Sequence, residues 1–205
     1  MKRFYSIFRD RIYEQIIKPI ILSVSPIDEI ALGVGIGMFV GFTPTVGLQM
    51  WIVFLIWLVS KYFLKLRFDL VVGTALVWIS NPLTMFPMYY AFLATGIFVF
   101  SLLNLESIDL EYEVFYHRLH DIISNSDFSS LDIIIESGKF FIVDLGLPMF
   151  VGSFVYAIPL SIGSYFLTQR MLLRYRMKKA KKMGISYEAW KQKFEKKKLK
   201  ETAKL

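Results

Sequence analysis

Three long apolar blocks dominate the sequence, at residues 31–64, 70–103 and 139–168. Each block is about 30 residues long or longer, and about 20 apolar residues are enough for a helix to cross the hydrocarbon core of a bilayer. Of the 205 residues, 55% are hydrophobic and only 20% are charged, whereas soluble domains average about 25% charged residues. This composition excludes a soluble globular domain or a disordered chain and predicts an all-α integral membrane protein.

Positive charge is concentrated at the two ends of the chain and in one short link. Residues 170–205 contain 14 Lys or Arg against 3 Glu, and the link 61–69 carries three further bases. Residues 104–138 instead hold 8 acidic residues against one Arg. Because cytoplasmic loops accumulate Lys and Arg, we expect both termini and the link inside and the acidic insert outside. The first block, which joins two inside segments, must then form a re-entrant or full hairpin.

This pattern divides the chain into three regions. Residues 1–24 place apolar side chains at helical spacing among bases, which is typical of an interfacial amphipathic helix. Residues 25–168 form the membrane domain, which contains the external insert 104–138, and residues 169–205 form a basic cytoplasmic tail. Charged residues interrupt the first 30 positions, so we do not expect a cleavable signal peptide.

The first block contains a stripe of glycines and then a break. Gly33, Gly37 and Gly41 recur every four residues, so on a helix they form one face without side chains that allows close helix packing. Pro44 follows, between Gly41 and Gly47, and proline interrupts a helix. A helix over 31–42 is only about 18 Å long, which is short of the roughly 30 Å core. We therefore expect it to end inside the membrane, with a second arm over 48–64.

The second block repeats this arrangement. A helix over 70–79 is about 15 Å long and is interrupted by Ser80, Asn81 and Pro82 before the block continues over 83–103. Irregular backbone at this depth persists only where protein buries it or a watery cavity lines it. The two breaks therefore predict a polar site near the midplane.

Half-helices that begin at such breaks point free N–H groups at the site, which suits an anionic group such as a lipid phosphate. The candidate substrate-binding residues are Thr43, Pro44, Thr45, Gly47, Gln49, Ser80, Asn81 and Pro82. The alternative is that Gln49 and Asn81 only hydrogen-bond the backbone groups that the prolines leave unsatisfied. The sequence favours neither of these two interpretations over the other.

Two further clusters have a functional and a structural interpretation. Asp144 is the one acid well inside an apolar block and is a candidate for proton coupling, although it could instead pair with Lys139 or reach the headgroups. Four residues would share one helical face and could hold a divalent metal: Glu113, His117, His120 and Asp121. An ordinary amphipathic helix explains the same spacing.

Other classes of chemistry find little support. Cysteine is absent, which excludes thiol catalysis, Cys-ligated zinc and iron–sulfur clusters. Because no catalytic motif is present, we expect no enzyme activity and no cofactor. The basic tail suits anionic headgroups of membrane lipids, and no nucleic-acid-binding motif accompanies it. The glycine stripe would also allow packing in a homo-oligomer.

Three runs of residues resemble one known family. They are residues 31–37, then Gly41-Phe42-x-Pro44-x-x-Gly47-x-Gln49, then Ser80-Asn81-Pro82-Leu83-Thr84. Together they resemble the bacterial membrane family catalogued as domain of unknown function 2062, over about residues 20–170. The resemblance implies a multi-pass protein of the bacterial inner membrane with no established activity, and it supplies no catalytic residues.

Two functions are compatible with these features. The leading hypothesis is a small solute or lipid transporter that uses the two proline-broken helices as its substrate site. The competing hypothesis is a membrane scaffold or partner-binding protein that transports nothing, in which the breaks and the glycine stripe serve packing.

Overall fold

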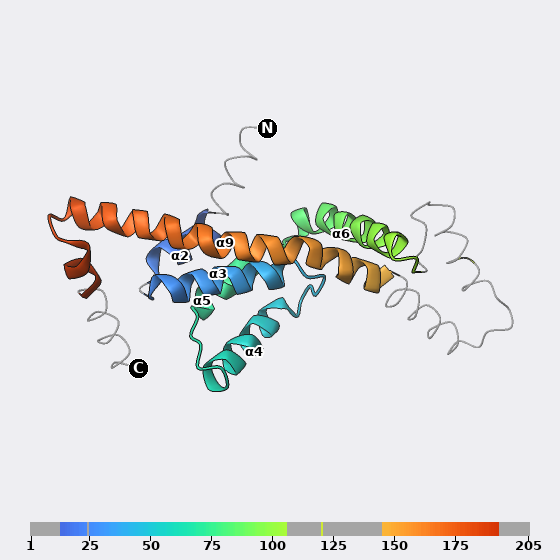
Figure 1. The fold of residues 1–205 in the computed structure, drawn as a ribbon, viewed down its shortest axis with the longest axis horizontal. Coiled ribbons are helices and arrows are strands. Elements are labelled where there is room, and N and C mark those ends of the chain that lie inside the picture. Colours follow the sequence, from blue (N-terminus) through green and yellow to red (C-terminus); the bar gives the residue numbers. More distant parts are fainter. Residues whose placement is uncertain (1–12, 24, 106–119, 121–144, 193–205) are drawn as a thin grey trace. The chain divides into compact units, whose positions relative to one another are not determined.

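The computed structural model describes residues 13–23, 25–105, 120 and 145–192 (Figure 1). The regular elements of these residues are helical, which confirms the all-α prediction. They include the π-helical turn η1 (Tyr13–Ile17) and the helices α2 (Lys18–Leu22), α3 (Ile27–Gly41), α4 (Gln49–Tyr62), α5 (Leu70–Val77), α6 (Pro82–Leu102) and α9 (Leu147–Lys182).

The helices of eight or more residues fall into two length classes. Thr84–Leu102 of α6 and the 36-residue α9 are long and apolar enough to cross a membrane. By contrast, α3, α4 and α5 have 15, 14 and 8 residues, or about 22, 21 and 12 Å at 1.5 Å per residue. Each of these three is shorter than the roughly 30 Å hydrocarbon core.

The chain divides into two compact units. Unit 1 comprises Met1–Gly41, Thr45–Ile79 and Pro159–Leu205, and unit 2 comprises Phe42–Pro44 and Ser80–Ile158. Both units share α9, and the boundary on that helix falls at Pro159. The division by relation to the membrane, into 1–24, 25–168 and 169–205, stays a prediction.

In unit 1, α3 and α5 run parallel and in close contact. The glycine stripe of α3 faces α5: a Cβ atom on Gly33 would lie 2.6 Å from the carbonyl oxygen of Asp69, and one on Gly41 would lie 3.0 Å from the side chain of Ile79. Successive glycines meet successively later residues of α5, so the two helices point the same way. Their buried side chains share a core with one residue of α9: Ile30, Val34, Val72, Leu76 and Leu172.

Helix α4 runs back from the end of α3 toward the start of α5. Its Val53 packs with Val40, Phe68 and Val77 in a second core cluster. The other apolar side chains of α4 are half-buried or exposed, including Trp51 at 65%.

In unit 2, α6 crosses the first turns of α9 at two glycines. A Cβ atom on Gly96 would collide with the backbone of Pro148, and one on Gly152 with the backbone of Phe92. The ring of Phe92 contacts three others, those of Phe42, Tyr89 and Tyr156, at centroid distances of 5.7–6.1 Å. Through Phe42, the segment that follows α3 belongs to unit 2.

Candidate functional site

The two helix breaks begin side by side at one end of the α3–α5 pair. Helix α3 ends at Gly41, and a Cβ atom on this glycine would meet the side chain of Ile79, two residues beyond the end of α5. Phe42 directly follows Gly41, and Ser80 directly follows Ile79. The chain therefore leaves the helix pair at two neighbouring points, one before Pro44 and one before Pro82.

Both helices also begin level with each other. The amide N–H of Asp69 donates a hydrogen bond to the carbonyl oxygen of Glu29 at 2.9 Å. From Glu29 to Gly41 the chain rises about 18 Å, and from Asp69 to Ile79 about 15 Å. The two breaks thus lie at nearly the same distance from the charged end of this helix pair.

In the first break, Gln49 joins the two helices that the break separates. Its side chain is 4% exposed, and its Nε2 atom donates to the carbonyl oxygen of Gly41 at 3.5 Å. Gly47 has a φ angle of +84°, a conformation that glycine adopts without steric cost. Gln49 thus donates a hydrogen bond to a carbonyl group at the end of α3.

In the second break, Asn81 caps α6. The amide N–H of Thr84 donates to Asn81 Oδ1 at 3.3 Å, and the amide N–H of Asn81 donates to Thr84 Oγ1 at 3.0 Å. This reciprocal pair is a capping-box arrangement, in which each side chain accepts a hydrogen bond from the other residue's backbone N–H group. Pro82 occupies the first helical position, where a missing N–H costs nothing.

The candidate substrate-binding residues are divided between the units. Unit 2 contains Thr43, Pro44, Ser80, Asn81 and Pro82, and unit 1 contains Thr45, Gly47 and Gln49. Thr43 is buried, while Thr45 and Ser80 are half-buried. Their role in binding a substrate stays a prediction.

A second polar cluster lies at the opposite end of α3, where α2, α3, α5 and α9 meet. The Ser23 hydroxyl donates to Asp69 Oδ2, while Asp69 Oδ1 caps α5 by accepting from the amide N–H of Val72 at 3.1 Å. An Asp immediately before an apolar run is a recognisable N-cap signal, so the local sequence around Asp69 already indicates this capping role.

Arg176, in the charged half of α9 beyond its apolar segment, completes this cluster. The side chain is 8% exposed, and Nη2 donates to the carbonyl oxygens of Ser25 at 2.8 Å and Ser23 at 3.2 Å. Burial lowers the pKa of Arg176 below its ordinary value, and Tyr187 partly offsets this effect. The guanidinium also lies 5.6 Å from the ring centre of Trp190. Nothing in the local sequence pattern of the basic tail marks Arg176 as a buried base.

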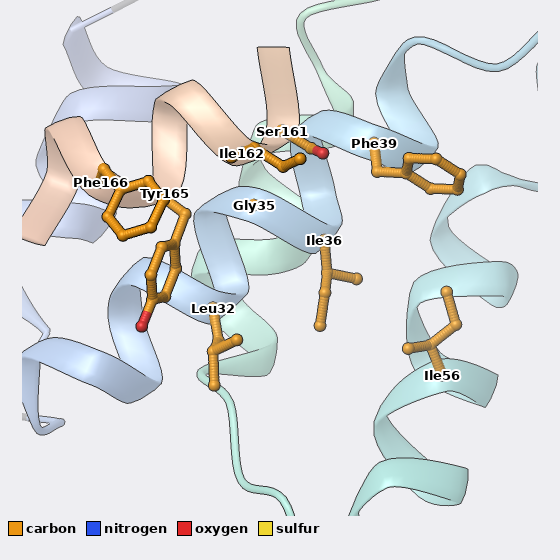
Figure 2. Close-up of a pocket in the computed structure, with 9 residues that line it drawn as sticks. All are labelled: Leu32, Gly35, Ile36, Phe39, Ile56, Ser161, Ile162, Tyr165 and Phe166. Atoms are coloured by element: carbon orange, nitrogen blue, oxygen red, sulfur yellow. The ribbon is translucent and has the colours of Figure 1, made fainter. Parts of the chain in front are cut away.

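Figure 2 shows a groove in unit 1 between α3, α4 and α9. Its volume is about 510 Å³, and its lining is almost wholly apolar. The lining residues are Leu32, Gly35, Ile36, Phe39, Ile56, Ser161, Ile162, Tyr165 and Phe166. The sequence gives no signal for this groove, because its residues look like any other apolar residues of membrane helices.

One end of the groove is polar. The Gln169 side chain donates through Nε2 to the Tyr165 hydroxyl at 2.9 Å and to Asp28 Oδ1 at 2.8 Å. The bond to Asp28 ties α9 to the first turn of α3. The groove therefore runs from a hydrogen-bonded rim into an apolar interior.

The remaining candidates lie mostly outside the described residues. This is true of Asp144, the proton-coupling candidate, and of the metal-ligand candidates Glu113, His117 and Asp121. His120 is described and is exposed. Within the described part of the chain, no three His, Asp or Glu side chains are grouped so that they could hold a metal ion.

Comparison with known proteins yields one match. No curated protein and no solved structure matches the chain. A family model matches residues 10–181, which covers most of the chain and confirms the resemblance carried by the Gly/Pro/Gln and Asn-Pro motifs. The chain therefore belongs to the family described as "Uncharacterized protein conserved in bacteria (DUF2062)".

Proposed function

We propose that this chain is a multi-pass protein of the bacterial inner membrane that passes a small solute or a lipid through a site at its two helix breaks. The observation that carries the proposal is the adjacency of Gly41 and Ile79, from which both breaks begin. Many secondary transporters build their substrate site near the membrane midplane from helices interrupted in this way.

Charge and length support a location of the breaks near the midplane. Glu29 and Asp69 mark the charged end of the α3–α5 pair, and the basic link 61–69 leads into that end. In that link, the Lys61 ammonium lies 4.5 Å from the ring centre of Trp57, and aromatic and basic residues gather at membrane interfaces. With this end at the cytoplasmic interface, breaks about 15–18 Å away fall about halfway across a roughly 30 Å core.

The proposed topology follows from the same placement. Helices α3 and α4 form a re-entrant hairpin that enters from and returns to the cytoplasmic side. The α5–α6 segment crosses to the outside, residues 104–138 lie outside, and α9 returns, so that both termini are cytoplasmic. In this topology the basic segments lie on the cytoplasmic side and the acidic residues 104–138 lie outside, as the positive-inside rule predicts.

A scaffold without transport is the second candidate, and a specific observation favours it. Gln49 and Asn81 already hydrogen-bond the backbone of the breaks, so neither amide needs a substrate as its partner. In this alternative the close contact of α3 with α5 and the exposed apolar surface of α4 would serve assembly with a partner or a second copy.

Water access to the breaks separates the two candidates. The chain contains no cysteine, so single cysteines at Thr45 and Ser80 can be labelled with a membrane-impermeant thiol reagent from each side of the membrane. The exposed Ser186 of the tail provides a control position on the cytoplasmic side. Labelling at both break positions supports transport. Failure of both to react from either side, in folded protein whose control position reacts, supports the scaffold.

A further inference from the structure

We infer that the groove between α3, α4 and α9 holds one acyl chain of an anionic phospholipid whose headgroup binds Arg170 and Arg174. The site is separate from the helix breaks, and the inference requires only the membrane location in the proposed function, not transport. The proposed occupant of the groove is a lipid of the cytoplasmic leaflet.

The shape and chemistry of the groove suit a hydrocarbon chain. Its volume of about 510 Å³ falls within the range of about 300–1,000 Å³ that is typical of ligand pockets. Ile162 and Phe166, both 54% exposed, form an open side through which a chain can enter from the surrounding lipid. A lipid tail is as apolar as a leucine side chain, so a chain in the groove gains mainly dispersion contacts with groove walls that would otherwise lack neighbours.

Because any lipid tail can make those contacts, selectivity must come from the rim. Arg170 lies one helical turn beyond Phe166 on α9, and Arg174 one turn further, which is about 5.4 Å per turn. Both side chains are exposed. Guanidinium groups bind phosphate oxygens with paired hydrogen bonds, so these two residues can hold a phosphodiester just outside the groove.

The net charge of the rim favours an anionic over a zwitterionic lipid. Asp28 contributes one negative charge there, and its Oδ1 atom accepts a hydrogen bond from Gln169. Arg170 and Arg174 follow the groove residues along α9 and carry two positive charges against that one negative charge. A phosphatidylglycerol headgroup, which carries one negative charge, balances the excess, whereas the ammonium group of phosphatidylcholine would face the arginines.

The direction of the groove agrees with a lipid in the cytoplasmic leaflet. Asp28 and Gln169 lie at the charged end of α3, and the lining residues Leu32, Ile36 and Phe39 follow at increasing distance from it. The stretch from Leu32 to Phe39 spans about 10 Å of helix. A lipid anchored at the rim would thus extend its chain from the interface toward the middle of the bilayer.

Native mass spectrometry of the full chain tests the inference. The protein is released from nanodiscs that contain equal amounts of phosphatidylcholine and phosphatidylglycerol. We expect one retained phosphatidylglycerol per chain, at about fivefold or greater preference. Retention of no lipid, or equal retention of both lipids, would overturn the inference.

Two pairs of variants locate the site. Ile162→Trp fills the groove and should reduce retention about fivefold, whereas Leu167→Trp, at a 58% exposed position outside the lining, should not. The double variant Arg170→Gln/Arg174→Gln should lose the preference for phosphatidylglycerol. Lys181→Gln/Lys182→Gln removes the same charge from exposed positions further along α9 and should keep it. An equal effect of test and control within either pair would contradict the site.

A measurement on the unaltered chain guards against variants that fail to fold. Phosphatidylglycerol with a photoreactive group in its acyl chain should crosslink to residues 32–39 and 161–166. Crosslinks confined to other segments would overturn the inference. Extraction of membranes with alkaline carbonate distinguishes this failure from failure of the proposed membrane location, because a peripheral chain is released and an integral one is not.

Discussion

Gly33 of α3 lies against the backbone of Asp69, so closely that a Cβ atom on Gly33 would be 2.6 Å from the Asp69 carbonyl oxygen. Side chains at this position would force the two parallel helices apart. Gly33→Ala should therefore lower the free energy of unfolding by about 1–3 kcal/mol, the usual cost of overpacking, as measured by thermal unfolding in detergent.

Gly163 of α9 provides the matched control, because nothing lies within 4 Å of a Cβ atom built there. Gly163→Ala should leave stability unchanged or raise it by up to about 1 kcal/mol through helix propensity. An equal decrease in the free energy of unfolding for the two variants would show that Gly33 is not required for the close contact of α3 with α5.

Asn81 allows capping and substrate contact to be separated. Asn81→Ala removes the Oδ1 acceptor for the Thr84 amide and should cost about 1 kcal/mol of stability. Asn81→Ser keeps a side-chain oxygen of comparable capping strength, so its thermal unfolding should match that of the unaltered chain.

The two variants also differ in what they test about function. A fluorescent phosphatidylglycerol that dithionite can bleach reports lipid translocation in proteoliposomes. If the Asn81 amide contacts the substrate, Asn81→Ser should lose translocation while it keeps stability. Full translocation in Asn81→Ser would restrict Asn81 to capping.

Gln49 should stabilise the first break through its bond to the Gly41 carbonyl oxygen. Gln49→Met keeps the length of the side chain but removes the donor, so we expect a loss of about 1 kcal/mol from the unsatisfied group. Met50→Leu, at an exposed neighbouring position, should change the unfolding midpoint little. A midpoint for Gln49→Met equal to that of the control would mean that this hydrogen bond contributes nothing.

Among the basic residues of α9, Arg176 should cause the largest loss of stability when it is substituted. Arg176→Met removes the donor to the carbonyl oxygens of Ser23 and Ser25, with an expected cost of about 1–3 kcal/mol for buried acceptors. Lys178→Met, at an exposed position two residues away, should stay within about 0.5 kcal/mol. Backbone hydrogen exchange at Ser23 and Ser25 should also become faster in Arg176→Met, because the α2–α3 link loses its contact with α9. Similar stability and hydrogen exchange in the two variants would contradict the role of Arg176.

The sequence by itself determined where the helices begin and end. The expected segments 31–42, 48–64, 70–79 and 83–103 correspond to α3, α4, α5 and α6 within a few residues. The reason is local: Pro44 and Pro82 restrict their own backbone and that of the preceding residue, whatever they pack against. The four-residue spacing of Gly33, Gly37 and Gly41 likewise fixes one helical face without further information.

Only the tertiary structure decided what those features meet. The spacing of residues does not predict that the glycine stripe packs on α5 or that Gly41 lies against Ile79. It also does not predict the hydrogen bond from Gln49 to the carbonyl group of Gly41. The groove requires side chains from three helices, and the burial of Arg176 depends on carbonyl oxygens of residues 23 and 25, far earlier in the chain. Such contacts join segments far apart in sequence, so no local propensity encodes them, and packing selects them from many helix arrangements compatible with the same pattern.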